Sequence, residues 1–221
     1  MSLLSNQINV FLNRFIRLRM RRRWRMLDGG PVSILSNNCL AGLIYHDLGL
    51  RFDSPTINLW IPLPSFITFV ENLDEALQAD IAEVHAAGRP YPVGQMVVGQ
   101  DQEEIPLHFM HYHTFREALE KWHSRSTRVD RSRLIIVAAD NAPCTDDQLR
   151  RFQSLPFPKL LLSHCRHSAE VIGHEVFYFK SMSGKPMNMT DFSGHFGRRF
   201  YHRINVPETL FQLLSYHQTT M

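Results

Sequence analysis

The strongest constraint on the fold is an uninterrupted run of apolar residues from Leu134 to Ala138. A short run of this kind is typical of a strand that is buried on both faces, as in a parallel sheet covered by helices. Val32 to Leu35 and Leu160 to Leu162 have the same character, and Val176 to Phe179 is expected to form an edge strand. These four segments predict the strands of one buried sheet.

Helical patterns alternate with these strands. Helices are expected over Leu40 to Leu48, Pro64 to Ile81, Thr114 to Arg128, Thr145 to Leu155 and Glu208 to Leu214. Thr114 and Thr145 are each followed three residues later by a Glu or Gln, which is the pattern of a capping box at a helix start. The alternation of strands and helices predicts an α/β layered domain with a largely parallel sheet.

Further strands interrupt this alternation. Pro92 to Val98 and Ile105 to Tyr112 are joined by a short acidic turn, a connection typical of an antiparallel pair, and Asn58 to Leu63 also has the pattern of a strand. The turn sequence Asp-Gly-Gly-Pro at residues 28–31 marks the beginning of the body. We therefore predict a single domain over residues 31–221, with a mostly parallel sheet and one antiparallel excursion.

Residues 1–30 differ from the rest of the chain in charge. They hold seven of the 24 basic residues and one of the 21 acidic residues, so the remaining body is mildly acidic. Apolar side chains recur among these arginines at the spacing of one helical face: Leu4, Ile8, Phe11, Phe15 and Leu18. The segment is therefore predicted to be a basic amphipathic helix.

Three kinds of partner are open for this helix. Its apolar face can dock on its own domain or on a second copy of the chain, which makes a homo-oligomer one alternative. Residues 1–26 can instead lie on an anionic membrane, with the arginines at the headgroups. Nucleic acid is the least favoured partner, because no nucleic-acid-binding motif accompanies the arginines.

The expected location is cytoplasmic, on the inner face of the membrane if the helix binds there. The arginines follow the apolar turn, whereas a secretory signal has its charges before the apolar core. No apolar run approaches the roughly 20 residues that a membrane-spanning helix needs.

The carboxyl ends of buried strands are where ligands bind in open α/β sheets, so polar residues there are the first candidates. Ser36, Asn37 and Asn38 follow the first strand and can hold an anion or a carbonyl group. Cys39 is expected in the first helical turn, where the helix dipole lowers a thiol pKa, so it is either a nucleophile or an inert, half-buried cysteine. Asp140 ends another buried strand and is either a catalytic or binding carboxylate or a cap for the next loop.

Three histidines, His108, His111 and His113, cluster in the sequence HFMHYH. On an extended strand His111 and His113 share one face, while His108 points to the other. No third ligand stands out at a metal-binding spacing, so no metal site is predicted. His111 is the candidate general base and His108 a candidate substrate ligand, with structural histidines as the alternative.

Other candidates are more scattered. Asp47, Ser54 and Asn58 belong to a polar stretch between the first two expected strands, and connections of this kind are often functional. Trp122 and Arg125 lie three residues apart on an expected helix and form either a binding pair or an exposed stacked pair.

The cysteines and a C-terminal basic cluster complete the set. Cys144 and Cys165, with His164, follow buried strands and can lie near one rim with Cys39. The three cysteines are expected to be reduced. The basic cluster at residues 198–203 can bind phosphate or remain solvated.

Several motifs occur together in a fixed order. They are Ser-Asn-Asn-Cys-x-x-Gly, Ile-Tyr-x-Asp-Leu-Gly-Leu, Ser-Pro-Thr-x-Asn-Leu, Tyr-Pro-Val-Gly, Leu-His-Phe-x-His-Tyr and Glu-Ala-x-Glu-Lys-Trp-x-x-Arg. This arrangement resembles a bacterial domain-of-unknown-function family whose members are commonly labelled exopolysaccharide biosynthesis proteins. The resemblance covers about residues 32–164, continues more loosely to the C-terminus and leaves out the arginine-rich head. Its motif positions are Ser36, Asn37, Asn38, Cys39, Asp47, Ser54, Asn58, Gly94, His108, His111, Trp122 and Arg125.

The resemblance implies a cytoplasmic-side role in building or decorating a surface polysaccharide, and it names no cofactor. We expect a transferase acting on a sugar or glycan, which can be nucleotide- or lipid-linked. Asn37, Asn38 and Asn58 would hold hydroxyl or phosphate groups, and a histidine such as His111 would deprotonate the acceptor. A variant uses Cys39 as the nucleophile of an acyltransferase or hydrolase. The rival interpretation is a non-catalytic peripheral-membrane scaffold of a polysaccharide assembly system.

Overall fold

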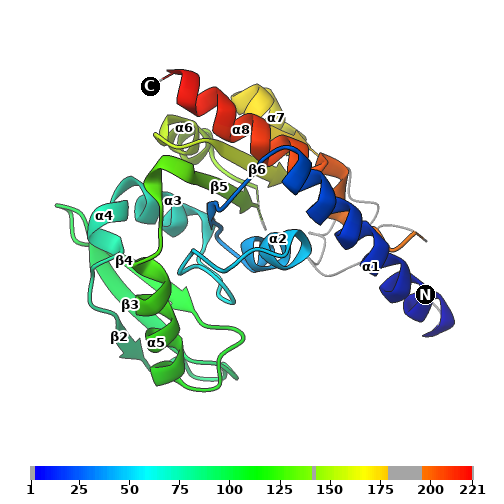
Figure 1. The fold of residues 1–221 in the computed structure, drawn as a ribbon. Coiled ribbons are helices and arrows are strands. Elements are labelled where there is room, and N and C mark those ends of the chain that lie inside the picture. Colours follow the sequence, from blue (N-terminus) through cyan, green and yellow to red (C-terminus); the bar gives the residue numbers. More distant parts are fainter. Residues whose placement is uncertain (1–2, 141–142, 179–195, 221) are drawn as a thin grey trace.

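The computed structural model describes residues 3–140, 143–178 and 196–220. Its central feature is a parallel sheet of four strands, which are β1 (Ser33–Leu35), β5 (Leu134–Ala139), β6 (Lys159–Ser163) and β7 (Val176–Tyr178). The strand order is β1-β5-β6-β7, and each neighbouring pair is parallel (Figure 1). Every residue of β1, β5 and β6 is buried, as their apolar character predicts, and β7 lies at the edge.

A second, smaller sheet is antiparallel and contains the antiparallel strand pair that the sequence predicts. It contains β2 (Ala82–Val84), β3 (Val93–Val98) and β4 (Glu103–His108) in sequence order. The prediction that the last strand continues to Tyr112 is wrong, because β4 ends at His108. The expected strand over Asn58 to Leu63 is also wrong: within it only Trp60 pairs, in a single bridge to His108, and Asn58 has a left-handed φ of 64°.

The helices occupy the expected places with two differences: one expected helix is divided, and α7 was not predicted from the sequence. They are α1 (Leu3–Met26), α2 (Leu40–Leu48), α3 (Leu63–Glu71), α4 (Leu73–Ala76), α5 (Phe115–Ser126), α6 (Asp146–Ser154), α7 (Arg166–Ile172) and α8 (Val206–Thr220). Short 3-10 turns lie at Arg131–Arg133, Gly173–Glu175 and Phe200–Ile204. The single helix expected over Pro64 to Ile81 is instead two helices, divided at Asn72, whose side-chain amide donates to Thr68 O (3.0 Å). An Asn side chain that bonds to nearby backbone in this way competes with the continuing helix.

The two capping boxes differ in how fully they form. At α6 the Thr145 hydroxyl accepts the Gln148 N–H and the Gln148 side chain accepts the Thr145 N–H, so this box is confirmed. At α5 the Thr114 hydroxyl accepts the Glu117 N–H, but the Glu117 carboxylate accepts from the His113 N–H instead. Both caps fix the helix starts where the sequence places them.

Helices cover both faces of the parallel sheet (Figure 1). On one face Ile34, Ile135 and Val137 pack with apolar residues of α2, α8 and the C-terminal half of α1. On the other face Leu35 and Ile136 belong to a larger buried cluster that includes α3, α6, Trp122 of α5 and the inner residues of the antiparallel sheet. The class is therefore α/β, with a mostly parallel sheet, a small antiparallel sheet and an N-terminal helix, as predicted.

The N-terminal helix α1 packs on α2 and α8, but not through the face that the sequence indicates (Figure 1). Its buried side chains are Asn9, Asn13, Met20 and Trp24. The predicted apolar face points to solvent: Ile8, Phe11, Phe15 and Leu18 are exposed. The expectation that this stripe docks on the chain's own domain is therefore wrong.

Specific polar contacts hold α1 in this orientation. The Gly197 N–H donates to Asn9 Oδ1 (2.9 Å) and Asn13 Nδ2 donates to Gly197 O (2.8 Å). At the other end the Trp24 indole N–H donates to Gly30 O (3.0 Å). In between, the Arg21 guanidinium donates to the carbonyl of His46 (2.8 Å) in the last turn of α2, where a cation is favoured by the helix dipole.

Candidate functional site

The carboxyl ends of β1 and β5 lie side by side at one edge of the parallel sheet. The helix that follows β1, α2, packs on one face of the sheet, whereas the helix that follows β5, α6, packs on the opposite face. Adjacent parallel strands whose connections leave on opposite faces create a crevice beyond their carboxyl ends, which is where ligands bind in open α/β sheets. The residues of interest are those directly after β1, β5 and β6.

Asn37 connects the carboxyl ends of β1 and β5. Its Nδ2 donates to Ala139 O (3.0 Å) and its Oδ1 accepts the Ala139 N–H (2.9 Å), which extends the pairing of β1 and β5 by one side chain. The Asn37 carbonyl also accepts the Ile61 N–H (2.9 Å). Asn37 is fully occupied in these bonds and is buried, so it positions the edge rather than offering groups to a ligand.

Ser36 and Ser54 are likewise committed to the structure. The Ser36 N–H donates to the Thr56 hydroxyl (3.0 Å), which lies 3.1 Å from the Ser54 hydroxyl. All three residues are buried. This hydroxyl cluster fixes the path of the chain after α2, and it needs no ligand to be satisfied.

Asn38 and Cys39 lie at the start of α2, at this edge of the sheet. Asn38 Oδ1 accepts the Leu40 N–H (2.9 Å), while its Nδ2 is buried and has no hydrogen-bond partner among the described residues. An unpaired buried amide is costly unless a ligand or water completes it, so Asn38 is a candidate ligand contact. Cys39 is half-buried, and burial raises the pKa of its thiol, contrary to the lowering expected from the helix dipole.

The group with the most hydrogen bonds among the candidate residues at this edge is a pair formed by an aspartate and a histidine. Asp140 lies directly after β5, and His164 directly after β6, with Asp140 Oδ1 and His164 Nδ1 2.7 Å apart. The Asp140 side chain is fully buried and also accepts from the His164 N–H (3.3 Å), the Ser163 hydroxyl and the Ser168 hydroxyl (3.5 Å). The neighbouring strands β5 and β6 thus bring together residues that are 24 positions apart.

This arrangement specifies what the imidazole can do. When Nδ1–H donates to a buried carboxylate, the tautomer is fixed and Nε2 carries the lone pair. The His164 side chain is 14% exposed, and in the part of the chain that the structure describes its Nε2 has no hydrogen-bond partner. His164 is therefore oriented as a general base with its free nitrogen available to a ligand.

Two thiols lie close to the pair. The negative charge of Asp140 and the Cys165 thiol act on Cys144, and with burial, the largest effect, they raise the pKa of the Cys144 thiol to about 12. Cys144 and Cys165 therefore lie near the same rim, as predicted, and Cys144 is a neutral thiol at physiological pH. The three cysteines are free, in agreement with the expectation of reduced thiols.

Asp47 lies at the other end of α2, away from the sheet edge. Its Oδ2 accepts from the Tyr201 hydroxyl (2.7 Å) and from His202 Nε2 (2.7 Å). Burial alone would raise the pKa of Asp47, but the hydrogen bonds from His202 and Tyr201 outweigh it and lower the pKa. The carboxylate ties the 3-10 turn Phe200–Ile204 to α2 and is a structural residue.

The histidines of the HFMHYH sequence occupy three different settings. His108, the last residue of β4, stacks on Trp60 with ring centroids 4.5 Å apart, and its Nδ1 is buried with no hydrogen-bond partner in the part of the chain that the structure describes. Burial and the positive charge of Arg89 lower the pKa of His108. His111 and His113 are exposed on the turn after β4, so the expected shared strand face does not exist.

Trp122 and Arg125 lie in the interior and not on the surface. The Arg125 guanidinium donates to the Tyr112 hydroxyl (2.6 Å) and lies over the Phe52 ring, 5.5 Å from its centroid. The Tyr112 hydroxyl in turn donates to Ile57 O (3.0 Å). These contacts hold the segment that contains Asn58 against α5. The expectation of an exposed stacked pair is wrong.

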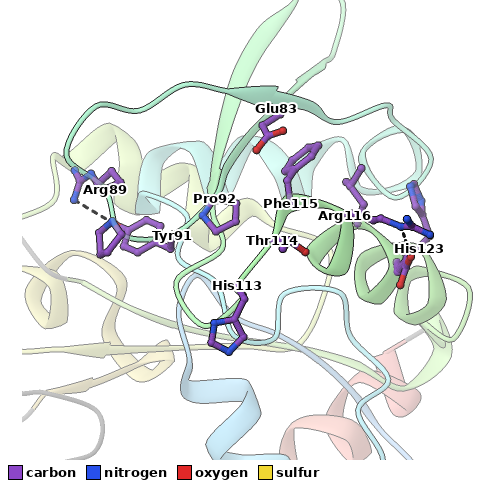
Figure 2. A pocket seen from close by; sticks show the side chains of 12 residues that line it. Glu83, Arg89, Tyr91, Pro92, His113, Thr114, Phe115, Arg116 and His123 are labelled. Carbon is purple, nitrogen blue, oxygen red and sulfur yellow. Dashed lines mark hydrogen bonds and ion pairs between the residues drawn. The ribbon is translucent and has the colours of Figure 1, made fainter.

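A separate cavity of about 800 Å³ lies on the antiparallel sheet, beside the start of α5 (Figure 2). Figure 2 shows His113 and Thr114 directly before α5, with Phe115 at the start of the helix on the side of Glu83. The hydrogen bond between Arg89 Nη1 and the Tyr91 hydroxyl (3.2 Å) closes one side. Of the predicted histidine cluster, only His113 contributes to this cavity.

Two features are absent from the described part of the chain. Within residues 3–140, 143–178 and 196–220 no group of three His, Cys, Asp or Glu side chains is arranged to hold a metal ion. Over the same ranges no helix has the length and apolar character that crossing a bilayer requires.

Comparison with known proteins decides the family. Residues 9–206 match the family described as "Domain of unknown function (DUF1919)". The chain belongs to the DUF1919 family. It is also 28% identical, over 201 residues that cover 90% of both chains, to a protein of Haemophilus influenzae described as "Uncharacterized protein".

The DUF1919 match is longer than the resemblance seen in the sequence motifs. That resemblance begins near Val32, whereas the family match begins at residue 9 and so includes most of α1. This extent agrees with the packing of α1, since Met20 and Trp24 are part of the buried cluster that covers the parallel sheet. The helix belongs to the DUF1919 fold.

The residue of this DUF1919 chain whose role the sequence motifs miss is His164, the partner of Asp140. Its position directly after one buried strand, next to the strand that Asp140 follows, is the signal that could have paired them. The sequence places both strand ends on the rim but does not order the strands. Without the β5-β6 adjacency, the bond between Asp140 and His164 cannot be derived.

Proposed function

We propose that this chain is a transferase that acts on a sugar or glycan in the biosynthesis of a cell-surface polysaccharide. The observation that carries the proposal is the pair formed by the buried Asp140 and the partly exposed His164 at the carboxyl edge of the sheet. The sequence resemblance to proteins labelled as exopolysaccharide biosynthesis proteins supplies the substrate class.

In the proposed reaction His164 is the general base. Its Nε2 takes the proton from an acceptor hydroxyl while the hydroxyl oxygen forms a bond to the electrophilic carbon of the donor. The bond between that carbon and the donor's leaving group breaks, and the leaving group departs with the electron pair. Asp140 stabilises the imidazolium that results, because its carboxylate accepts the Nδ1–H throughout.

Other candidates take supporting roles in this proposal. Asn38, with its unpaired buried amide, is the group best suited to hold a substrate hydroxyl or phosphate oxygen. Asn37 positions the edge through its bonds to Ala139. His111 is not favoured as the base, since it is an exposed residue of the turn after β4 that is bonded to Asn58 O through its backbone N–H (3.3 Å).

A thiol nucleophile is the weaker variant. The raised pKa values of Cys39 and Cys144 keep both sulfurs protonated near pH 7, and the thiol is a much poorer nucleophile than the thiolate. We therefore favour direct attack by the acceptor over a covalent intermediate on Cys39.

The test is a pair of matched histidine variants. His164→Asn should lower polysaccharide output in cells that depend on this protein by a factor of about 10² or more, the usual contribution of a general base. His167→Asn is the control. His167 lies three residues after His164 in the chain, but it is exposed and its ring is bonded to the exposed Asp146 (2.6 Å). The control variant should leave output unchanged. Asp140→Asn should match His164→Asn in effect.

Direct binding is measured with the purified protein and a panel of nucleotide sugars, read as thermal stabilisation. Stabilisation by one donor that is weakened in Asn38→Ala would support the assigned site. Normal polysaccharide output from His164→Asn, at wild-type protein level, would remove His164 as the base.

A second candidate function is a non-catalytic peripheral scaffold of a polysaccharide assembly system at the inner face of the membrane. The exposed apolar stripe of α1 favours it. The same histidine variants separate the two functions: a scaffold keeps its output in His164→Asn and loses it when the surface of α1 is altered.

A further inference from the structure

The outward face of α1 exposes more apolar surface than a solvated helix needs. Ile8, Phe11, Phe15 and Leu18 are large apolar side chains, yet they are 49%, 57%, 56% and 60% exposed. They are spaced three or four residues apart, so they form one continuous stripe. The Phe11 and Phe15 rings contact each other edge to face, with centroids 5.2 Å apart. An apolar stripe on the surface of a folded protein indicates a docking site.

Arginines continue and flank this stripe. Arg22 and Arg25 extend it toward the C-terminal end of α1, at the same spacing of three or four residues, and Arg14 and Arg19 lie on its two sides. All four are exposed. The helix has no acidic residue along its whole length. The outward face is therefore apolar over residues 8–18 and basic over residues 19–25.

We propose that this face of α1 docks on an anionic membrane surface. The four apolar side chains enter the boundary between headgroups and acyl chains, and the four arginines contact the lipid phosphates. The proposal deepens the peripheral location named above and is independent of the chemistry of Asp140 and His164.

Charge complementarity distinguishes the membrane from the other two partners. In a symmetric pairing of two copies, each copy presents the same face, and arginines would be buried against a helix that offers no carboxylate. Nucleic acid would account for the arginines but would leave Phe11, Phe15 and Leu18 without a partner. An anionic bilayer satisfies both halves of the face.

The inner face of α1 holds the helix flat on the body while the outer face remains free. Asn9 and Asn13 are bonded to Gly197, and the Arg23 side chain forms an ion pair with Glu208 (2.6 Å) on α8. Because the docking face lies opposite the buried face, membrane contact requires no unfolding and no rotation of the helix. The surface is preorganised, which lowers the entropic cost of binding.

A small basic cavity adjoins the C-terminal half of the helix. It has a volume of about 170 Å³ and is lined by Arg19, Arg23 and Arg198, with Glu208 paired to Arg23. The excess of positive charge at this cavity suits a phosphate group of a lipid headgroup.

The experiment is cosedimentation of the full chain with lipid vesicles. Vesicles of phosphatidylcholine mixed with phosphatidylglycerol should retain the protein, and vesicles of phosphatidylcholine alone should retain it at least roughly tenfold less, because the arginine contribution is lost. Added salt should weaken retention on the anionic vesicles.

Two double variants test the two halves of the face. Phe11→Ser with Phe15→Ser should abolish retention, and Arg22→Gln with Arg25→Gln should weaken it by roughly tenfold or more. The matched controls are Val97→Ser with Met110→Ser, which removes exposed apolar side chains elsewhere, and Arg116→Gln with Arg166→Gln. These controls should bind as the wild type does. Circular dichroism verifies that every variant is folded. We expect all of them to fold, because the altered side chains are exposed and contribute little to the core.

Three kinds of result would overturn the proposal. The first is a failure of the vesicle experiment itself: the wild-type protein does not sediment with anionic vesicles, or the double variant Phe11→Ser with Phe15→Ser sediments as the wild type does. The second is a concentration-dependent dimer that the phenylalanine variants abolish, which would make a second copy the occupant. The third is salt-dependent retention on DNA that the arginine variants abolish while vesicle binding is absent.

Discussion

Asp47 shows what a buried carboxylate does for stability in this chain. Its two strong hydrogen bonds, from Tyr201 and His202, connect the C-terminal region to α2 over more than 150 residues. We expect Asp47→Asn to lower the free energy of unfolding by about 2–3 kcal/mol at pH 7, since bonds to a charged group are worth more than neutral ones. Urea denaturation measures this, with the exposed Asp101→Asn as the control. Equal stability of the two variants would show that the bonds contribute little.

The lowered pKa of Asp47 also sets the direction of the pH dependence. A carboxyl group whose pKa is lower in the folded state stabilises the fold above its unfolded value of about 4, and this contribution is lost as the pH falls through the lower, folded value. The wild type should therefore lose stability below about pH 4 more steeply than Asp47→Asn does.

Single residues were predictable where a strand end alone defines their place. Ser36, Asn38 and Asp140 follow apolar runs, and that pattern places them on the carboxyl edge of a sheet. The pairing of Asp140 with His164 was not predictable, because it depends on which strands are neighbours. The structural commitment of Asn37 to the Ala139 backbone was equally invisible, since an Asn after a strand looks the same whether it holds a ligand or a neighbouring strand.

Among the elements, α1 depends on one glycine for its position. Gly197 has a left-handed φ of 66°, and a Cβ there would lie 2.5 Å from Asn13 N and 2.7 Å from Asn9 O. Gly197→Ala should therefore separate the N-terminal half of α1 from the body and destabilise the protein by about 1–3 kcal/mol, combining clash and backbone strain. Hydrogen exchange should become faster in α1 before it does in β5.

The matched control for this glycine is Gly173→Ala. Gly173 has a similar φ of 61°, but no atom lies within 4 Å of the added Cβ, so it isolates the backbone strain from the clash. A Gly197→Ala protein whose α1 amides exchange no faster than those of Gly173→Ala would contradict the role assigned to this contact.

Most elements followed from the sequence because local signals decide them. The caps at Thr114 and Thr145 and the apolar run at β5 are of this kind. The orientation of α1 did not follow. Hydrophobic periodicity defines the stripe from Ile8 to Leu18 but leaves its partner open, and polar side chains with partners on Gly197, more than 180 residues away, hold the opposite face against the body.

For the whole molecule, one buried cluster joins the two sheets. Phe69 of α3 lies in it, 6.0 Å from the Trp122 ring of α5 and 6.0 Å from the Phe66 ring. Phe69→Ala should lower the free energy of unfolding by about 3–5 kcal/mol. Because the cluster includes residues of β3, β4, β5 and β6, both sheets should lose hydrogen-exchange protection together. Phe11→Ala, at an exposed ring, is the control. Loss of protection confined to one sheet would show that the sheets unfold separately.

The burial of Trp24 has a practical consequence for any truncated protein. Its ring packs so closely on Gly29 that a Cβ at this position would lie 2.1 Å from the Trp24 ring. Arg21 of the same helix donates to a backbone carbonyl in the last turn of α2. The other end of α2, about 13 Å away along the helix, is the Asn38 and Cys39 turn of the candidate site. Removing the N-terminal helix would expose the apolar side chains of α2 and α8 that it covers, and it would release one end of α2, whose other end carries the candidate site. A loss of function in a shortened chain would thus report damage to the fold, so substitutions on the outer surface of the helix are needed to test the proposed membrane docking separately from the proposed chemistry.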